Sequence, residues 1–183
     1  MNFYNEMMDA NGGVRAHYKR YDEWLKATPP ERIARKRAEA DLAFHRVGIT
    51  FAVYGEESGK ERLIPFDIIP RIIPSTEWKA LQSGLRQRVK ALNMFLDDIY
   101  HDQEILKAGK IPAEQVLNNA QYRPDMKGVD VPGCIYAHIA GVDVVRAGAG
   151  ELYVLEDNLR VPSGVSYMLE DRKMMMRLFP KLF

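Results

Sequence analysis

The chain has 183 residues, of which 46% are hydrophobic and 28% charged, and this length allows one domain, or a core with a subsidiary lobe. Lys and Arg (26) nearly balance Asp and Glu (25), so the strongly basic field typical of nucleic-acid binding is absent. The single cysteine, Cys134, excludes an internal disulfide and fits a reducing compartment, and no apolar run reaches membrane-spanning length. We therefore expect a cytoplasmic protein that binds neither nucleic acid nor a membrane.

Residues 1–48 predict a helical N-terminal arm. The opening segment is polar and interrupted by glycines at 12 and 13, which favours irregular structure with one short helix at most. A stronger helix follows: Thr28 can act as its N-cap, Pro29 suits the first helical position, Glu31 completes a capping box and Gly48 is a natural stop. The basic run at 35–37 is interpreted as a solvated helix face, because the chain as a whole is nearly neutral.

The next elements are predicted from residue periodicity. Residues 49–54 and the apolar run that starts at Leu63 flank a Gly-Glu-Glu-Ser-Gly turn and predict a β-hairpin. Ser75 is predicted to cap a short helix over 77–82. A separate amphipathic helix is predicted over 85–100, where leucine, valine and isoleucine recur every three or four residues.

The C-terminal half predicts a short helix over 113–118, two β-rich runs at 134–146 and 151–158, and a closing helix from Val165 that Pro180 ends. The three methionines at 174–176 are interpreted as packing residues with some exposed surface. These elements indicate the α+β (α/β) class, with a mixed, largely antiparallel sheet and flanking helices. We expect residues 49–183 to form one compact unit beside the arm of 1–48.

The two β-rich runs carry the main candidate site. A hairpin whose loop is centred between Ala149 and Gly150 places Asp143 opposite Glu156, with Asn158 two residues along on the same face. Two carboxylates that face each other repel unless a cation lies between them, and Asp, Glu and Asn oxygens suit Mg²⁺ or Mn²⁺. The alternative is an exposed hairpin end in which Asp143 pairs with a neighbouring arginine.

Residues after the second run could bind anions. Arg160 follows Asn158 on the same face if the strand continues, where it could stabilise a transferring phosphoryl group, or it could form a salt bridge with Asp157 or Glu170. Ser163 and Gly164 open the closing helix, whose free N–H groups could hold an anion; Ser163 could equally be a plain N-cap.

Weaker candidates lie elsewhere in the chain. His17 and His138 are possible acid–base residues, although a structural role is favoured for both. Asp67 and Arg71 could bind substrate or form a structural ion pair.

Long motifs give the sequence a family resemblance. VLEDNLRVPSG at 154–164, preceded by HIAGVDVVR and followed by SYMLEDR, resembles circularly permuted ATP-grasp proteins related to glutathionylspermidine synthetase. The segments GITF at 48–51, PFDIIPRII at 65–73, EW at 77–78 and GLRQRVKALNMFLDDIY at 84–100 resemble them too. The resemblance implies a partial circularly permuted ATP-grasp fold over 49–183.

The same resemblance implies an activity and ligand roles. Such enzymes use ATP and Mg²⁺ to join a small-molecule or peptide carboxylate to an amine through an acylphosphate. In the synthetase branch an acidic residue and a Glu-x-Asn pair hold Mg²⁺, and these fall on Asp143, Glu156 and Asn158. An arginine two residues before the acidic ligand is replaced here by Gly141, so either the catalytic arginine is lost or Arg146 or Arg160 substitutes for it.

Two functions are therefore compared. The first is the N-terminal part of an ATP- and Mg²⁺-dependent ligase, since family members usually continue with a nucleotide-clamping lobe, and we expect these 183 residues alone to be inactive. The second is a non-catalytic binding module that keeps the fold. Homo-oligomerisation is left open.

Overall fold

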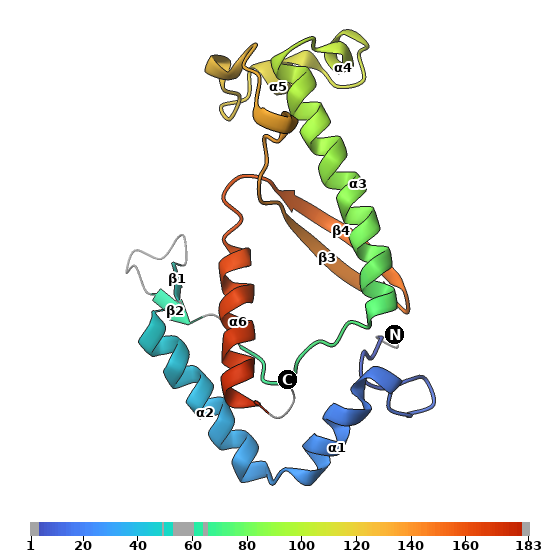
Figure 1. Cartoon of the computed structure of the whole chain (residues 1–183), viewed down its shortest axis with the longest axis vertical. Coiled ribbons are helices and arrows are strands. Elements are labelled where there is room, and N and C mark those ends of the chain that lie inside the picture. The colour runs from blue at the N-terminus through green and yellow to red at the C-terminus, as the bar shows by residue number, and fades with distance from the viewer. Residues whose placement is uncertain (1–3, 49, 53–60, 64–65, 181–183) are drawn as a thin grey trace. The chain divides into compact units, whose positions relative to one another are not determined.

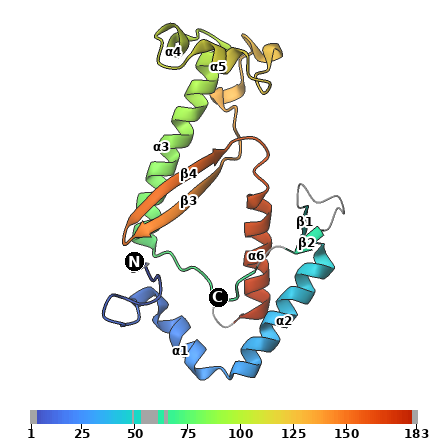
Figure 2. The same cartoon turned by 180° about the vertical axis from the view of Figure 1, so that it is seen from behind.

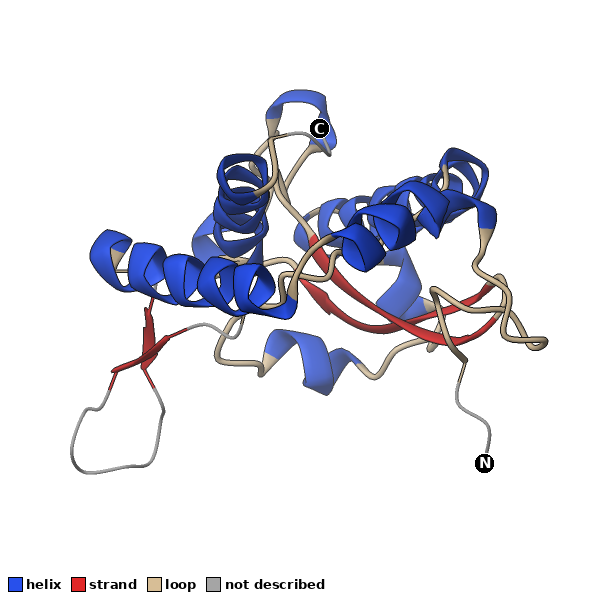
Figure 3. Ribbon diagram, turned by 90° about the horizontal axis from the view of Figure 1, so that it is seen from below, coloured by secondary structure: helices blue, strands red, loops and turns tan. Residues whose placement is uncertain are grey.

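The structure, a computed structural model, describes residues 4–48, 50–52, 61–63 and 66–180 (Figure 1). In chain order its elements are η1 (Ala16–Tyr18), α1 (Lys19–Ala27), α2 (Pro30–Val47), β1 (Thr50–Ala52), β2 (Glu61–Leu63), α3 (Ser75–Tyr100), α4 (Glu104–Lys107), α5 (Ala113–Leu117), η2 (Pro124–Met126), η3 (Pro132–Cys134), β3 (Gly141–Gly148), β4 (Glu151–Asn158) and α6 (Gly164–Leu178). Within the described residues the strands form two separate antiparallel pairs, β1 with β2 and β3 with β4 (Figure 3). The predicted α+β class is confirmed.

The chain divides into two compact units. The first unit comprises Met1–Pro74 and Ser163–Phe183, and the second unit comprises Ser75–Pro162. The predicted boundary at residue 48 does not coincide with this division. The N-terminal helices instead share a unit with the closing helix, because α2 packs against α6 (Figure 2).

The core of the first unit joins residues from both ends of the chain. Phe44 on α2 and Ile68 are each 1% exposed, and the ring of Phe44 lies 4.9 Å from that of Phe66. From α6 and the residue after it come Met174, Met175, Leu178 and Phe179. Met176 is 47% exposed, so the interpretation of the methionine run as packing plus surface is confirmed.

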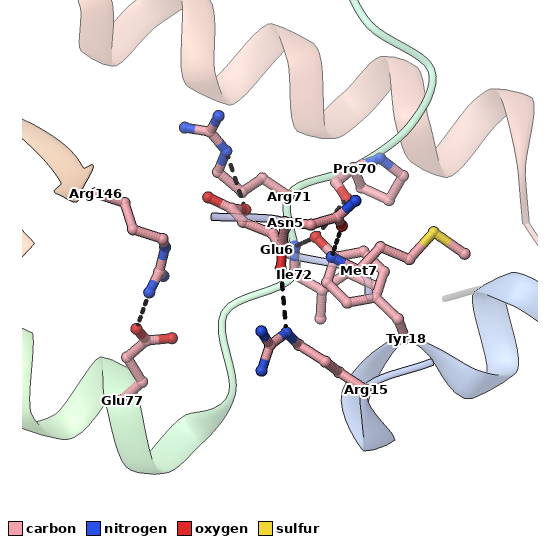
Figure 4. Close-up of polar contacts among 10 residues, drawn as sticks. All are labelled: Asn5, Glu6, Met7, Arg15, Tyr18, Pro70, Arg71, Ile72, Glu77 and Arg146. Carbon is pink, nitrogen blue, oxygen red and sulfur yellow. Dashed lines mark hydrogen bonds and ion pairs between the residues drawn. The ribbon is translucent and has the colours of Figure 1, made fainter. Parts of the chain in front are cut away.

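Tyrosines hold the segment 66–74 onto the N-terminal arm within the first unit. The Tyr18 hydroxyl accepts a hydrogen bond from the Ile72 amide (2.9 Å) and donates one to the Pro70 carbonyl (3.3 Å) (Figure 4). The buried Tyr21 hydroxyl donates to the Ile68 carbonyl (3.3 Å). These bonds satisfy main-chain groups of a proline-containing segment that is not in a sheet.

The helix in the arm begins one residue later than predicted. The Thr28 hydroxyl donates to the Trp24 carbonyl (2.6 Å) at the end of α1, so it cannot cap α2, and Pro29 takes the N-cap position. Gly48 ends α2 as predicted, in the left-handed conformation (φ 70°) that glycine adopts without steric cost.

The prediction of two helices over 77–100 was wrong. A single helix, α3, runs from Ser75 to Tyr100 through Gly84. A glycine inside a helix costs only about 1 kcal/mol relative to alanine, which contacts along a 26-residue helix can outweigh. Because Glu77 and Arg88 are 11 residues apart, three turns of the continuous helix place them on one face.

The β-rich run at 134–146 is only partly a strand, because β3 begins at Gly141. The amides of Tyr136 and Ala137 both donate to the side-chain oxygen of Asn93 on α3, at 2.8 and 2.9 Å. A helix side chain therefore satisfies main-chain groups that a strand would have paired. The hairpin predicted near residue 50 is confirmed as the pair β1 and β2, but β2 ends at Leu63, where the predicted second run begins. Its turn at 55–59 lies outside the described residues.

Candidate functional site

The predicted pairing of Asp143 with Glu156 is confirmed, but two β-bulges produce it. Val142 pairs with Asp157, Asp143 with Glu156, and Gly141 with Asn158. Between these pairs and the loop the register shifts by one residue and then shifts back, leaving Leu155 and Ala147 outside the pairing. The two shifts cancel, so the simple register prediction is correct at the site and wrong in the middle of the hairpin.

The bulge at Leu155 decides which side chains share a face. In the middle of the hairpin Val145 pairs with Tyr153, and both are exposed. Strict alternation from Tyr153 would send Glu156 to the opposite face. The extra residue reverses the alternation, so Glu156 and Asn158 lie on the face of Asp143 and Tyr153, called here the front face, and Asp157 lies on the other, the rear face.

Two ion pairs join the rear face to α3 inside the second unit. Arg88 holds Asp157 with two nitrogens: Nε lies 2.8 and 2.9 Å from the two carboxylate oxygens, and Nη2 lies 2.6 Å from Oδ2. Arg146 on β3 donates to Glu77 near the start of α3 (Figure 4), and both side chains are mostly buried. The hydrogen bond from Arg88 lowers the pKa of Asp157, and the same bond raises the pKa of Arg88.

The front face presents Asp143, Glu156 and Asn158 together. Asp143 and Glu156 are exposed, and Asn158 is half-buried. The Asn158 amide nitrogen donates to Glu156 Oε1 at 2.9 Å, which confirms that these two side chains lie on one face. Asp143 makes no hydrogen bond or ion pair with any described residue, so the predicted alternative, a pair with a neighbouring arginine, does not occur there.

The donor set fits a hard divalent cation. Asp143 and Glu156 stand directly opposite each other without a positively charged partner among the described residues, an arrangement that costs free energy unless a cation neutralises it. A half-turn of the Asn158 amide would present its oxygen instead of its nitrogen. No group of three or more His, Cys, Asp or Glu side chains suited to a metal occurs in the described chain, so this mixed set of two carboxylates and an amide is the candidate.

The two candidate arginines lie in different places. Arg160 is exposed, and its Nη1 donates to Gln121 Oε1 at 2.8 Å, so neither predicted salt bridge, with Asp157 or with Glu170, forms. Arg146 lies on the rear face, away from Asp143, and is bonded to Glu77. Arg146 therefore has a visible structural partner on α3, whereas the partner of Arg160 among the described residues is a neutral amide.

Gly141 lies where little room exists for a side chain. A Cβ atom at this position would come 2.7 Å from Cβ of Pro162, closer than real carbon atoms approach. Any larger residue at 141 would push apart β3 and the segment after β4. The hairpin as built therefore requires glycine two residues before Asp143.

The two predicted anion-binding residues, Ser163 and Gly164, open α6 and belong to the first unit. Both are exposed. Ser163 occupies the N-cap position, but its hydroxyl makes no capping hydrogen bond, so the first amides of α6 are not capped by this side chain.

The weaker candidates have separate surroundings. His138 is exposed, and the ring of His17 lies 5.0 Å from that of Tyr18. Arg71 Nε lies 3.2 Å from Glu6 Oε2 (Figure 4), while Asp67 accepts a hydrogen bond from the Ile69 amide at 2.9 Å. Asp67 and Arg71 are therefore not paired with each other, and each makes a local structural contact.

Residues near the C-terminus of α3 were missed by the sequence analysis. His101 Nδ1 bonds to the Asp97 carbonyl (2.9 Å). Its Nε2 is buried without a hydrogen bond from any described residue and lies 3.5 Å from Asp130 Oδ1. The Tyr136 hydroxyl donates to Asp97 (3.1 Å), and burial together with this bond raises the pKa of Tyr136 to about 12. Asp97 and His101 are only four residues apart, whereas Asp130 and Tyr136 come from distant segments, of which spacing in the sequence gives no signal.

Arg88 and Asp171 were also missed. Asp171 on α6 has a carboxylate oxygen that is buried without a hydrogen bond among the described residues, and burial raises its pKa. Arg88 lies outside the apolar positions of its helix, and the sequence gives no indication of its partner Asp157.

Among the described residues, none of the helices combines the length and the apolar composition that a membrane span requires.

Comparison with known proteins defines the class that this fold and site represent. Residues 70–183, well over half of the chain, match the family described as a circularly permuted ATP-grasp. The chain belongs to this family. The matched range contains β3, β4, α6 and every residue of the candidate site.

Individual relatives extend the similarity to the whole chain. The chain is 44% identical over 182 residues to an uncharacterized protein of Synechocystis, covering 100% of this chain and 38% of that protein. It is 45% identical over 181 residues to an uncharacterized protein of Mycobacterium leprae, covering 98% and 31%. A Frankia casuarinae protein that carries the provisional name glutamate–cysteine ligase 2-2 is 39% identical over 183 residues, covering 98% and 20%. The chain thus spans less than two fifths of the length of these relatives.

Proposed function

We propose that this chain forms the metal- and phosphate-binding part of an ATP- and Mg²⁺-dependent ligase that joins a carboxylate to an amine. The single observation that supports this most is the convergence of Asp143, Glu156 and Asn158 on the front face of the hairpin. Membership of the ATP-grasp family and the ligase name of the Frankia relative point to the same class of reaction.

Each site residue has a proposed role. Asp143 and Glu156 supply carboxylate oxygens, and Asn158 an amide oxygen, to Mg²⁺ or Mn²⁺, which when bound would neutralise and orient the phosphates of ATP. Arg160, whose partner among the described residues is the neutral amide of Gln121, can leave it to contact the transferred phosphoryl group. The amides at Ser163 and Gly164 would bind phosphate oxygens.

The proposal follows the branch related to glutathionylspermidine synthetase, with one change. An arginine cannot occupy position 141, because Pro162 lies too close. Of the two substitutes considered, we assign the catalytic role to Arg160. Arg146 is on the rear face and bonded to Glu77, so we assign it a structural role.

The remaining assignments concern partners. We propose that the acid is a small-molecule or peptide carboxylate, that the acceptor is an amine, and that the protein acts in the cytoplasm. The acylphosphate route needs the metal beside the γ-phosphate, so the hairpin site would act in the activation of the acid and not in the choice of the amine.

Binding of Mn²⁺ to the chain tests the site directly. Sub-stoichiometric Mn²⁺ should broaden the NMR signals of amides at 142–144 and 155–158 first, because paramagnetic broadening falls steeply with distance. Glu156→Ala should abolish this selective broadening. Glu151→Ala, which removes the same charge from an exposed position at the loop end of β4, should leave it intact. Selective broadening that survives Glu156→Ala would show that the site assignment is wrong.

A second candidate function is a non-catalytic binding module. The observation that favours it is the steric requirement for glycine at 141, where the synthetase branch carries arginine. Calorimetric titration with Mg²⁺·ATP, followed by assay for ADP release with carboxylate and amine mixtures, separates the two. Metal-dependent ATP binding without turnover in any longer protein that contains this chain would favour the binding module.

A further inference from the structure

We infer that the Arg88–Asp157 pair is a positioning device for the proposed metal site: by anchoring Asp157 to α3, it holds Glu156 and Asn158 on the front face. The inference rests on the proposed function and extends it to two residues outside the donor set. Asp157 lies between two proposed ligands in the chain, yet it points in the opposite direction.

The contact has the geometry of a rigid clamp. Three short donor–acceptor distances, between 2.6 and 2.9 Å, join one guanidinium to both oxygens of one carboxylate. The Asp157 side chain is 14% exposed, so little water competes for it, while Arg88 is 46% exposed. Two parallel hydrogen bonds fix the carboxylate in orientation as well as distance, which a single contact would not do.

The Arg88–Asp157 contact lies in the part of the hairpin where a one-residue slip would give a second possible register. The bulge at Leu155 reverses the alternation of β4 just before Glu156, and a slip of one residue would turn Glu156 to the rear and Asp157 to the front. A two-stranded hairpin is only marginally stable by itself, so its register at the open end needs an external anchor. Arg88 provides that anchor, because it can hold Asp157 only on the rear face.

The second ion pair on the rear face, between Arg146 and Glu77, serves as the comparison for a purely structural contact. Glu77 and Arg88 lie on one face of α3, about 16 Å apart along the helix axis. Their partners Arg146 and Asp157 lie on the rear face. Asp157 pairs with Val142, which is four positions, or about 13 Å, from Arg146 along β3. Both pairs attach the hairpin to the helix, but only the Arg88 pair touches a residue adjacent to the proposed ligands.

The direction in which Mn²⁺ affinity changes distinguishes a positioning role of Arg88 from a purely electrostatic one. Loss of the Arg88 cation near two carboxylates should by Coulomb's law strengthen the binding of a divalent cation. Positioning predicts the opposite result. Arg88→Gln should weaken Mn²⁺ binding by about tenfold or more, the usual cost of removing an outer-shell partner of a metal ligand.

Two variants serve as matched controls. Arg86→Gln removes the same charge from an exposed residue of the same helix that makes no ion pair with a described residue, and should leave Mn²⁺ affinity equal or slightly higher. Glu77→Gln weakens the other contact between α3 and the hairpin, and should lower thermal stability without a tenfold loss of Mn²⁺ affinity. Affinity is measured from the free Mn²⁺ signal in electron paramagnetic resonance, well below the melting temperature of each variant.

A metal-free readout accompanies the titration. In the unmodified chain, cross-strand NOE contacts should join residues 142–143 to residues 156–157, as the pairing requires. Arg88→Gln should weaken these contacts, while the contacts between Val145 and Tyr153 persist. Arg86→Gln should change neither set.

The results distinguish two kinds of failure. If Glu156→Ala leaves selective Mn²⁺ binding unchanged, the proposed function fails, whatever Arg88→Gln does. If Glu156→Ala abolishes binding while Arg88→Gln and Arg86→Gln have equal Mn²⁺ affinities, the site assignment is supported and the positioning role is overturned. If Arg88→Gln loses both affinity and the NOE contacts at 142–143, the inference is supported.

Discussion

At the scale of single residues, neighbours in the sequence have opposite tasks. Asp157 bonds to a helix on the rear face, while Glu156 and Asn158 on either side of it face forward. Gly141 is needed because Pro162 leaves no room for a side chain, and not because its main chain adopts a left-handed conformation. Residue type alone would not separate these roles, since Asp157 has the same carboxylate chemistry as Asp143.

His101 leads to a prediction about pH. Its bond to the Asp97 carbonyl, with Asp97, Asp130 and Asp102 nearby, raises its pKa above the ordinary 6.5, and the hydroxyl of Tyr136 also lies on Asp97. A raised folded-state pKa means that protonation stabilises the fold. The stabilisation is complete below the unfolded-state pKa and is lost as the pH rises through the folded-state value.

We therefore expect His101→Gln to reduce stability more at about pH 5.5 than at about pH 8.5, measured by urea unfolding. His138→Gln, which replaces an exposed histidine of the same unit, is the control for the loss of an imidazole from the surface. Equal losses for His101→Gln at both pH values would contradict the raised pKa.

At the scale of elements, the two ion pairs between α3 and the hairpin depend on α3 being one continuous helix. One continuous helix places Glu77 and Arg88 on the same face, and the hairpin presents Arg146 and Asp157 to them. Two helices broken near Gly84 would not keep that alignment. The continuity of α3 therefore matters for the candidate site as well as for packing.

Gly84→Ala tests this continuity. A Cβ at Gly84 would meet no atom within 4 Å, so alanine should raise the free energy of unfolding by about 0.5–1 kcal/mol through its higher helix propensity. Gly109→Ala in the same unit also meets open space but has φ +65°, so it should be destabilising. The two variants differ chiefly in backbone conformation. A destabilising Gly84→Ala would indicate a break in the helix at this point.

At the scale of the whole molecule, the chain forms its first unit from its two ends. α6 returns to pack on α2, and the second unit, with α3 and the hairpin, lies between them in sequence. The proposed metal ligands are all in the second unit, whereas Ser163 and Gly164 are in the first.

Phe44→Ala tests the division into units. Phe44 is 1% exposed, and its loss should cost about 3–5 kcal/mol by leaving a cavity in the core shared by α2 and α6. Hydrogen exchange should accelerate more for amides of α2 and α6 than for those of α3. Leu42→Ala, at a position 52% exposed on the same helix, should change exchange little. Equal acceleration in all three helices would show that the chain unfolds as one unit.

Local signals in the sequence account for much of the local structure and for the strand pairing on which the candidate site depends. The stop of α2 at Gly48, the short helix α5, the closing helix and the pairing of Asp143 with Glu156 all follow from near neighbours, because caps, periodicity and hairpin loops are local effects. The motifs around Glu156 and Asn158 were sufficient for the family, which residues 70–183 confirm.

Three further features are visible only in the folded chain. The Arg88–Asp157 contact joins residues 69 positions apart, and the packing of α6 on α2 joins the two ends of the chain. The bulge at Leu155 is offset by a second register shift at Ala147 in the opposite strand. Hydrophobic periodicity states which side of an element is buried but not what covers it. Alternation along β3 places Arg146 on the face opposite Asp143, but its partner, Glu77 on α3, could be seen only in the folded chain.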